Sequence, residues 1–155
     1  MRDLPAPSRL SRRLIVGTLV LVLLGSVFVP TTTALVAPTR RALRVTWLVN
    51  NAREAYGLPR LPISYVLSKI ARRHSRQMAE REILFHGDLA RLLSRYDFEL
   101  AVDNVGAGKR LSSIVRGFLG SPTHAAHIFD PRWRLTGVGV VRSESWIWVT
   151  QIFYT

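Results

Sequence analysis

Two histidines three residues apart, His124 and His127, form the most concentrated group of potentially reactive side chains in this 155-residue chain. Imidazole can bind a metal ion or carry a proton near neutral pH, and residues three apart share one face of a helix. Thr123 is the predicted N-cap of that short helix, because the proline before it cannot continue the preceding helix. A glycine-punctuated strand, Gly137–Val141, follows, so we expect the histidines at a corner between elements, where functional side chains are commonly held.

The other two histidines and a possible carboxylate partner lie earlier in the chain. His74 falls on the apolar stripe of a helix predicted over 63–81, which favours a hydrogen-bonded core histidine over a ligand. His86 follows the end of that helix and stands beside a glycine. Asp103 and Asn104 begin the segment DNVGAG, whose glycines predict a turn with close backbone approach.

Hydrophobic periodicity predicts the helices that must position these side chains. Apolar residues recur at helical spacing over 41–56 and over 63–81, and a shorter helix is expected over 89–96. Ser112 or Ser113 is the predicted N-cap of a further helix that ends before Pro122.

Alternating patterns predict a small sheet. A weak strand is expected over 98–102, and the segments Gly137–Val141 and Trp146–Tyr154 flank four turn residues as in a hairpin. Both faces of Trp146–Tyr154 are largely apolar, so this strand is predicted to be central, with helices on both sides of the sheet. The predicted fold class is therefore α/β (α+β): a three-layer α-β-α sandwich with a small, mainly antiparallel sheet.

The N-terminus has the pattern of an export signal. Arg2, Arg9, Arg12 and Arg13 precede an uncharged apolar run, Leu14–Val29, which resembles a basic n-region followed by an h-region. The run is long for an h-region and short of the ~20 residues that span a bilayer. Residues 1–38 are therefore predicted to be either a cleaved signal peptide or a single transmembrane anchor, and residues 39–155 an exported domain, secreted or held at the membrane.

Composition limits the remaining classes. The chain has 48% hydrophobic residues, which is enough for a core, and no cysteine, which excludes disulfides and thiolate metal sites. Its net charge is +12, carried mostly by arginine, and the part beyond residue 38 keeps 18 basic and 9 acidic residues. A basic surface favours anionic lipid, wall polymer or nucleic acid. No nucleic-acid partner is expected, because no stretch interleaves arginine with aromatic residues.

Six short motifs occur along the chain in a recognisable order. They are LVNNAR followed by YGLP, a helix that carries Ala71, His74 and Met78, then FH, DNVGAG, SPTH, and finally GVGV with TQIF. Together they resemble the CAP superfamily (cysteine-rich secretory proteins, antigen 5 and pathogenesis-related 1 proteins) in its short, cysteine-free bacterial form. The resemblance covers about residues 45–153.

The resemblance implies a cleft lined by His86, Asp103 and His124, with Asn104 and His127 beside them. His86 and His124 fall where the family has its two cavity histidines. Asp103 replaces the family's cavity glutamate and is shorter by about 1.5 Å. A second acid of many eukaryotic members has no evident counterpart, and His127 stands where bacterial members usually carry asparagine.

Three kinds of chemistry are open to such a cleft. His86, Asp103 and His124 can bind zinc with water as the fourth ligand, and the metal can activate that water for hydrolysis. Against hydrolysis, there is no HExxH helix, and a triad of Ser121, His124 and Asp103 lacks a visible oxyanion hole and nucleophile elbow. The histidines can instead hydrogen-bond across the cleft and hold helix ends against the sheet.

The preferred interpretation is an exported CAP-domain binding module of the bacterial cell envelope rather than an enzyme. Its His/Asp-lined cleft is expected to take an apolar or envelope-derived ligand, with zinc or another divalent metal as a candidate cofactor. An apolar groove with exposed Trp or Ile side chains would favour this interpretation. Solvent-facing His86 and His124 with close ring nitrogens would favour a metal-dependent hydrolase. Salt-sensitive envelope binding would favour a basic protein that docks on anionic lipid or wall polymer.

Overall fold

The computed structural model describes residues 37–96 and 99–155. The signal or anchor segment predicted over 1–38 therefore lies, apart from its last two residues, outside the described residues, and the boundary at residue 38 stays a prediction. Within the two described ranges, no helix is both long enough and apolar enough to cross a membrane.

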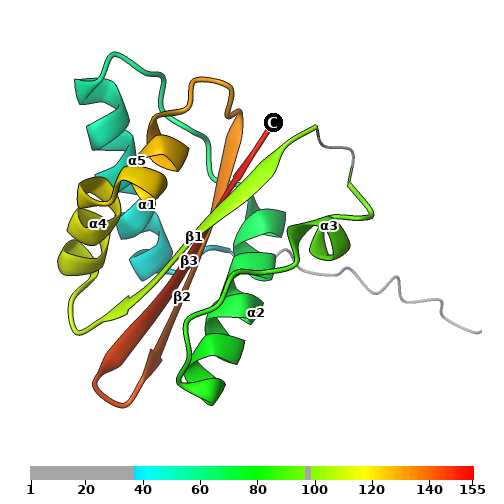
Figure 1. Cartoon of the computed structure of the whole chain (residues 1–155), viewed down its shortest axis with the longest axis vertical. Coiled ribbons are helices and arrows are strands. Elements are labelled where there is room, and N and C mark those ends of the chain that lie inside the picture. Colours follow the sequence, from blue (N-terminus) through cyan, green and yellow to red (C-terminus); the bar gives the residue numbers. More distant parts are fainter. Residues whose placement is uncertain (1–36, 97–98) are drawn as a thin grey trace, which may run out of the picture. The chain divides into compact units, whose positions relative to one another are not determined.

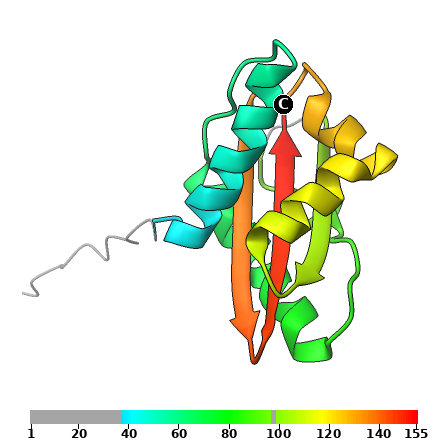
Figure 2. The same ribbon diagram turned by 90° about the vertical axis from the view of Figure 1, so that its left-hand side faces the viewer.

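A three-stranded antiparallel sheet forms the middle layer of the described domain. Its strands are β1 (Ala101–Gly108), β2 (Leu135–Ser143) and β3 (Trp146–Tyr154), in the order β1-β3-β2. Val149 of β3 lies opposite Gly106 of β1 and Val140 of β2. The prediction that Trp146–Tyr154 is the central strand is confirmed, and Figure 2 shows β3 between its two neighbours.

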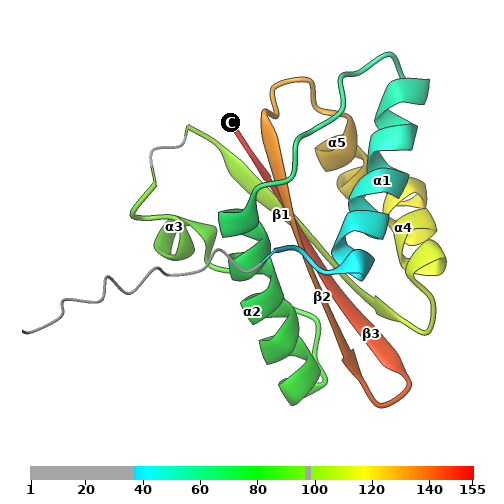
Figure 3. The same ribbon diagram turned by 180° about the vertical axis from the view of Figure 1, so that it is seen from behind.

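Helices cover both faces of the sheet. The long helix α2 (Tyr65–Arg81) packs on one face against β2 and β3, and α1 (Arg40–Ala55), α4 (Leu111–Gly120) and α5 (Pro122–Phe129) cover the other (Figures 1 and 3). A single-turn helix, α3 (Leu89–Leu92), lies in the connection from α2 to β1. The predicted α-β-α sandwich is confirmed.

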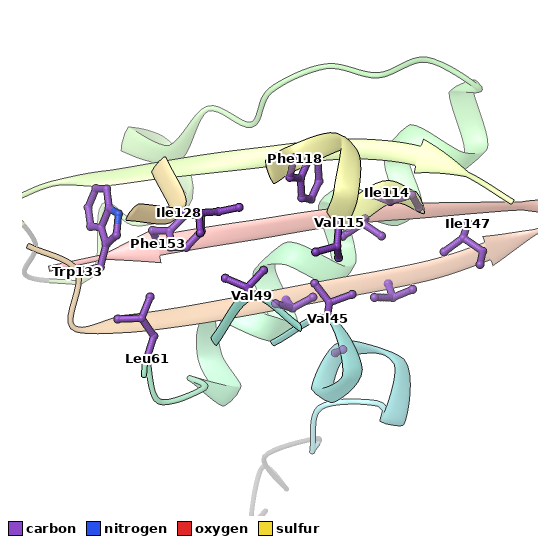
Figure 4. Packing of buried hydrophobic residues seen from close by; sticks show 14 residues of the cluster. Val45, Val49, Leu61, Ile114, Val115, Phe118, Ile128, Trp133, Ile147 and Phe153 are labelled. Atoms are coloured by element: carbon purple, nitrogen blue, oxygen red, sulfur yellow. The ribbon is translucent and has the colours of Figure 1, made fainter. Parts of the chain in front are cut away.

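The two faces of β3 supply two sides of the core. Ile147, Val149 and Phe153 pack beneath α1, α4 and α5, where they meet Val45, Val49 and Phe118 (Figure 4). Trp148 and Ile152 face the other way and pack against residues of α2. Because successive strand side chains point to opposite faces, the doubly apolar pattern of β3 follows directly from its central position.

Two glycines of β2 set how closely α2 approaches the sheet. A Cβ at Gly137 would overlap Leu67 and Ser68, and a Cβ at Gly139 would overlap the backbone of Ala71. The helix backbone therefore lies directly on the strand, and the Ser68 hydroxyl accepts from the Val138 N–H at 3.2 Å. This contact fixes both the height and the rotation of α2.

The segment DNVGAG is a strand rather than the predicted turn. Asp103 to Gly108 form most of β1 and pair in register with β3. The expected close approach does occur, and the partner is the helix α4 that packs on the strand. A Cβ at Gly106 would lie 2.9 Å from a ring carbon of Phe118 in α4. The glycines thus make room for a packed helix, and the strand expected over 98–102 begins at Ala101.

Several helix starts also differ from their predictions. The helix α2 begins at Tyr65 rather than at residue 63, because the Ser64 N–H donates to Thr136 of β2 and Ser64 caps the helix. Neither Ser112 nor Ser113 caps α4, whose N-cap is Arg110. The helix α5 begins at Pro122, with Ser121 rather than Thr123 as N-cap, because a first-turn proline needs no hydrogen-bond acceptor for its nitrogen. The helix expected over 89–96 is shortened to α3.

A buried arginine ties the end of α1 to the end of α5. Arg53 is fully buried, and its guanidinium donates to the carbonyl oxygens of Pro59 (3.0 Å), Ile128 (2.5 Å) and Asp130 (3.1 Å). The carbonyls at the end of a helix have no partner within the helix, so Arg53 satisfies groups that would otherwise be buried unpaired. This contact holds α5, and with it His124 and His127, at its place over the sheet.

Candidate functional site

The candidate site lies along the outer edge of β1, where consecutive residues face opposite sides of the sheet. Asp103 is paired in register with Ile152, whose side chain packs against α2, and Asn104 is paired with Gln151. Both Asp103 and Asn104 are buried. The strand therefore presents Asp103 to the segment that carries His86, and Asn104 to the helix that carries His124 and His127.

Asp103 holds His86 and the turn that follows α2. One carboxylate oxygen lies 2.6 Å from Nδ1 of His86, and the other accepts from the Gly87 N–H at 3.0 Å. The side chain of His86 is 62% exposed, whereas that of Asp103 is 6% exposed. A buried carboxylate thus holds the exposed imidazole of His86 at the surface through Nδ1. The other ring nitrogen of His86 is available to solvent or a ligand.

Asn104 holds α5 on the other side of the strand. Its side-chain oxygen lies 2.8 Å from Nδ1 of His127, and its amide nitrogen donates to the His124 carbonyl at 3.1 Å. The indole N–H of Trp133 donates to the His127 carbonyl at 2.6 Å. His127 is therefore a positioned, half-buried side chain, and the ring of His124 remains free of these contacts.

His124 lines an open cavity of about 350 Å³ beside β1 and α4. Its ring lies 5.2 Å from the ring of Phe118, and Ser121 lines the same cavity. Asp103 does not join Ser121 and His124 as the third member of a triad. Among the described residues, its carboxylate binds His86 and the Gly87 N–H instead. The Ser121–His124–Asp103 arrangement weighed from the sequence is thus not assembled.

His74 is a core histidine, as its place on the helix predicted. Its Nδ1 lies 3.1 Å from the Thr150 hydroxyl, which also contacts Ser75 at 2.9 Å, and its ring packs edge-on against Phe85. Its Nε2 is buried with no partner in the part of the chain that the structure describes. Burial lowers the pKa of His74, while Asp103 raises it and His86 lowers it. His74 is therefore neutral at pH 7.

The two α5 histidines are also held in their neutral form. Burial is the main cause that lowers the pKa of His124, and the positive forms of His127 and His86 lower it further while Asp103 opposes them. Burial likewise lowers the pKa of His127, with Asp103 acting in the opposite direction. His86, His124, His127 and Asp103 therefore lie close enough to sense one another's charge.

The predicted metal ligands do not converge as a metal-binding group. Among residues 37–96 and 99–155, no three His, Asp or Glu side chains are arranged to hold an ion. His86 and Asp103 use the facing atoms Nδ1 and Oδ1 to bind each other. A metal at His86, Asp103 and His124 would have to open that hydrogen bond, so the zinc site stays a prediction.

A groove with both apolar and polar lining residues adjoins the His124 cavity, and its residues were not predicted from the sequence. It has a volume of about 740 Å³ and shares Leu84 and Ala107 with the cavity. Its exposed apolar side chains are Ile83 (61%), Leu84 (48%) and Trp146 (46%). Isolated exposed apolar residues are ordinary, whereas here three of them surround one groove. The available signal was the apolar run Ile83–Phe85 directly after the polar end of α2.

A family model matches most of the described domain. The model of the cysteine-rich secretory protein family (CAP) matches residues 47–153. The YkwD protein of Bacillus subtilis (strain 168) is 29% identical to this chain over 116 residues, which are 70% of the chain and 45% of YkwD.

Solved structures have the same fold. An extracellular protein containing an SCP domain from Bacillus anthracis (strain Ames) superposes with a TM-score of 0.67 at 25% identity, over 74% of this chain and 40% of that protein. An outer surface protein of Borrelia burgdorferi gives a TM-score of 0.64 at 19% identity, over 77% of this chain and 96% of that protein. The chain thus spans less than half the length of the two Bacillus relatives.

Proposed function

Because the chain belongs to the cysteine-rich secretory protein (CAP) family, we propose that it is an exported binding module whose groove between the end of α2 and the β2–β3 hairpin holds an apolar or amphiphilic ligand of the cell envelope. The similar Bacillus anthracis protein is described as extracellular, which supports export. The apolar N-terminal run Leu14–Val29 supports it independently.

The observation that carries the proposal is the groove formed by Ile83, Leu84, Trp146 and Trp148. Ligand sites are concave and mostly apolar, with a few placed polar groups. This groove has a mixed lining: its apolar side chains lie beside Glu82, Ser143, Glu144 and Ser145, and the adjoining cavity ends at His124. A ligand with a hydrocarbon part and a small polar end fits this arrangement.

The His/Asp set has a positioning role in this proposal. Asp103 and His86 fix the turn that leads out of α2, directly after the segment that carries Ile83 and Leu84. Asn104 fixes α5 and with it His124. A divalent metal at His86, Asp103 and His124 remains a separate proposal, which calorimetric titration of zinc into the parent chain and a His86→Ala, His124→Ala variant tests.

Quenching of tryptophan fluorescence tests the groove. Residues 37–155, whose buried core lies within residues 42–153, would first be checked for folding by circular dichroism and then titrated with 9,10-dibromostearate. We expect saturable quenching, because Trp146 and Trp148 line the groove. Leu84→Asp is expected to weaken apparent binding by about tenfold, since a carboxylate in an apolar site costs several times the thermal energy.

A matched control separates the groove from general surface hydrophobicity. Leu43 of α1 is as exposed as Leu84 (47% against 48%) but does not line the groove. Leu43→Asp is expected to leave quenching unchanged. Equal weakening by both variants, or quenching that never saturates, would refute a ligand site at this groove.

A further inference from the structure

A row of four basic side chains follows one face of α2. Lys69, Arg72, Arg73 and Arg76 are spaced by three and four residues, so they are neighbours on the helix surface, and all four are exposed. They line a cavity of about 240 Å³ together with Val138 and Val140 of β2 and the chain segment 37–39. We call this surface the basic groove.

The row is left without internal counter-charges. None of its four cations forms an ion pair with another residue in the described ranges, and Glu80, one turn beyond Arg76, is not paired with it. Arg60, Arg91 and Arg132 behave differently, since their partners are Glu54, Asp88 and Asp130. Like charges three and four residues apart repel each other, so an anion bound in the groove would relieve repulsion within α2.

The helix that carries the basic groove is held in a fixed position on the sheet. Gly137 and Gly139 let the backbone of α2 lie directly on β2, so the helix cannot rotate without overlap. Ser68, between the row and the strand, is bonded to the Val138 N–H. The positive charges are therefore held along the outer edge of β2, at the opposite edge of the sheet from β1 and the candidate site.

The preceding chain indicates which anionic surface lies within reach. The apolar run Leu14–Val29 ends eight residues before Ala37, which itself lines the groove. Eight residues span at most about 28 Å when extended. When that run lies in a bilayer, the groove stays within this distance of the headgroups, at a high effective concentration. Wall polymer has no comparable tether to the groove.

We propose that the basic groove docks on the phosphate headgroups of anionic phospholipid and so orients the domain at the membrane. Clusters of basic residues close to a membrane-inserting segment bind anionic lipid through their summed charge. The basic groove shares no lining residue with the groove at Ile83, Leu84 and Trp146, so lipid contact and ligand binding can occur together. This proposal does not depend on the proposed function.

The test uses the full chain, reconstituted into vesicles. Because the chain has no cysteine, a Gln77→Cys substitution at an exposed position next to the row takes a single fluorophore. Vesicles of phosphatidylcholine alone, or with about one third phosphatidylglycerol, would both contain a headgroup spin label as quencher. The apolar run is present in every protein compared, so the variants below separate the contribution of the groove from that of the other basic residues. We expect about threefold stronger quenching in the anionic vesicles, lost at high salt.

Two variants in the labelled background make the test specific. The groove variant replaces Lys69, Arg72, Arg73 and Arg76 by glutamine and is expected to reduce quenching to the phosphatidylcholine level. The matched control replaces four exposed basic residues outside the groove by glutamine, namely Lys109, Arg110, Arg116 and Arg142. It is expected to keep the strong quenching in anionic vesicles. Circular dichroism would verify that both are folded.

Three outcomes would overturn the proposal. Equal loss in both variants would mean that net charge alone attracts the protein. Equal quenching in the two kinds of vesicle would mean that anionic lipid is not recognised. Loss of quenching in the anionic vesicles when poly(glycerol phosphate) is added at a matched phosphate concentration would assign the groove to a wall polymer instead.

Discussion

Asp103 and Asn104 are neighbours in β1, yet they hold different segments on opposite sides of the strand. Asp103 binds His86 and the Gly87 N–H beside α2, and Asn104 binds His127 and the His124 carbonyl in α5. The two histidine-bearing segments, far apart in sequence, are thus anchored to consecutive residues of one edge strand.

Removal of the Asp103 carboxylate is expected to loosen the turn at Gly87. In Asp103→Ala the Gly87 N–H loses its acceptor at 3.0 Å, and a lost hydrogen bond of about 1–1.5 kcal/mol corresponds to about tenfold faster amide exchange. In His86→Ala the acceptor remains and water replaces the exposed imidazole, so exchange should be unchanged. Hydrogen exchange measured by NMR at Gly87 checks this. Equal acceleration in both variants would show that the imidazole, not the carboxylate, holds the turn.

Conversion of Asn104 to a carboxylate is expected to raise the pKa of His127. Burial now lowers that pKa, and the Asn104 side-chain oxygen lies 2.8 Å from Nδ1. Asn104→Asp places a negative charge at this position, which favours the imidazolium by about 1–3 pKa units. NMR titration of the histidine ring signals measures the shift. The His124 ring does not contact Asn104, so its smaller response serves as an internal reference, and an unmoved His127 would contradict the geometry.

The close contact between α2 and β2 predicts unequal effects of two glycine substitutions. Gly139→Ala would drive a methyl group into the backbone of Ala71 and Arg72, and this overlap is expected to cost more than about 3 kcal/mol of the free energy of unfolding. Gly117 in α4 has open space at its Cβ position. Gly117→Ala should therefore be neutral or stabilise the protein by up to about 1 kcal/mol. Urea unfolding measures both, and a mild effect at Gly139 would mean that α2 does not lie on the strand.

Stability is expected to fall as the pH drops below about 6.5. The folded-state pKa values of His74, His124 and His127 are lowered, chiefly by burial, while an unfolded chain protonates histidine near 6.5. Above that pH both states are neutral and the full stability is present. Below it, the unfolded state binds protons first, and stability is lost as the pH falls toward the folded-state values. Melting temperatures at pH 7.5, 6.5 and 5.5 measure this dependence.

A His74 variant identifies the part of that pH dependence that comes from the core. His74→Gln removes the most deeply buried of the three imidazoles, which faces Asp103 and His86 and has an unpartnered Nε2 among the described residues. The variant is expected to be less stable at pH 7.5, because packing against Phe85 is lost, but its stability should change less between pH 6.5 and 5.5. Parallel curves for the two proteins would exclude His74 as a contributor.

Periodicity was sufficient to predict the layers of the fold. The doubly apolar alternation of Trp146–Tyr154 reflects burial on both faces, and burial on both faces is what a central strand experiences. The stripe through Ala71, His74 and Met78 likewise marks the face of α2 that meets the sheet. Both patterns are local consequences of tertiary burial, so they can be read without knowledge of the partners.

Features set by a distant partner could not be predicted in the same way. The glycines of DNVGAG have the composition of a turn. Their place in a strand is explained by α4, because a Cβ at Gly106 would lie 2.9 Å from Phe118 and a Cβ at Gly108 would lie 3.2 Å from Ile114. The start of α2 depends on a hydrogen bond between Ser64 and Thr136, more than seventy residues apart. The same holds for the site. The order of the motifs, compared with the family, predicted that His86, Asp103 and His124 lie near one another. It could not predict that His86 hydrogen-bonds to Asp103, because that contact depends on distances and side-chain directions.

The central position of β3 has a consequence for the order in which the sheet can form. Both outer strands precede the middle strand in sequence, so β1 and β2 have no strand to pair with until residues 146–154 are present. The β2–β3 hairpin needs only the two-residue turn at 144–145, whereas pairing of β1 with β3 must close a loop of more than thirty residues and is the slower step. The three-stranded sheet of the described domain can therefore form only once residues 146–154 are available to both neighbours.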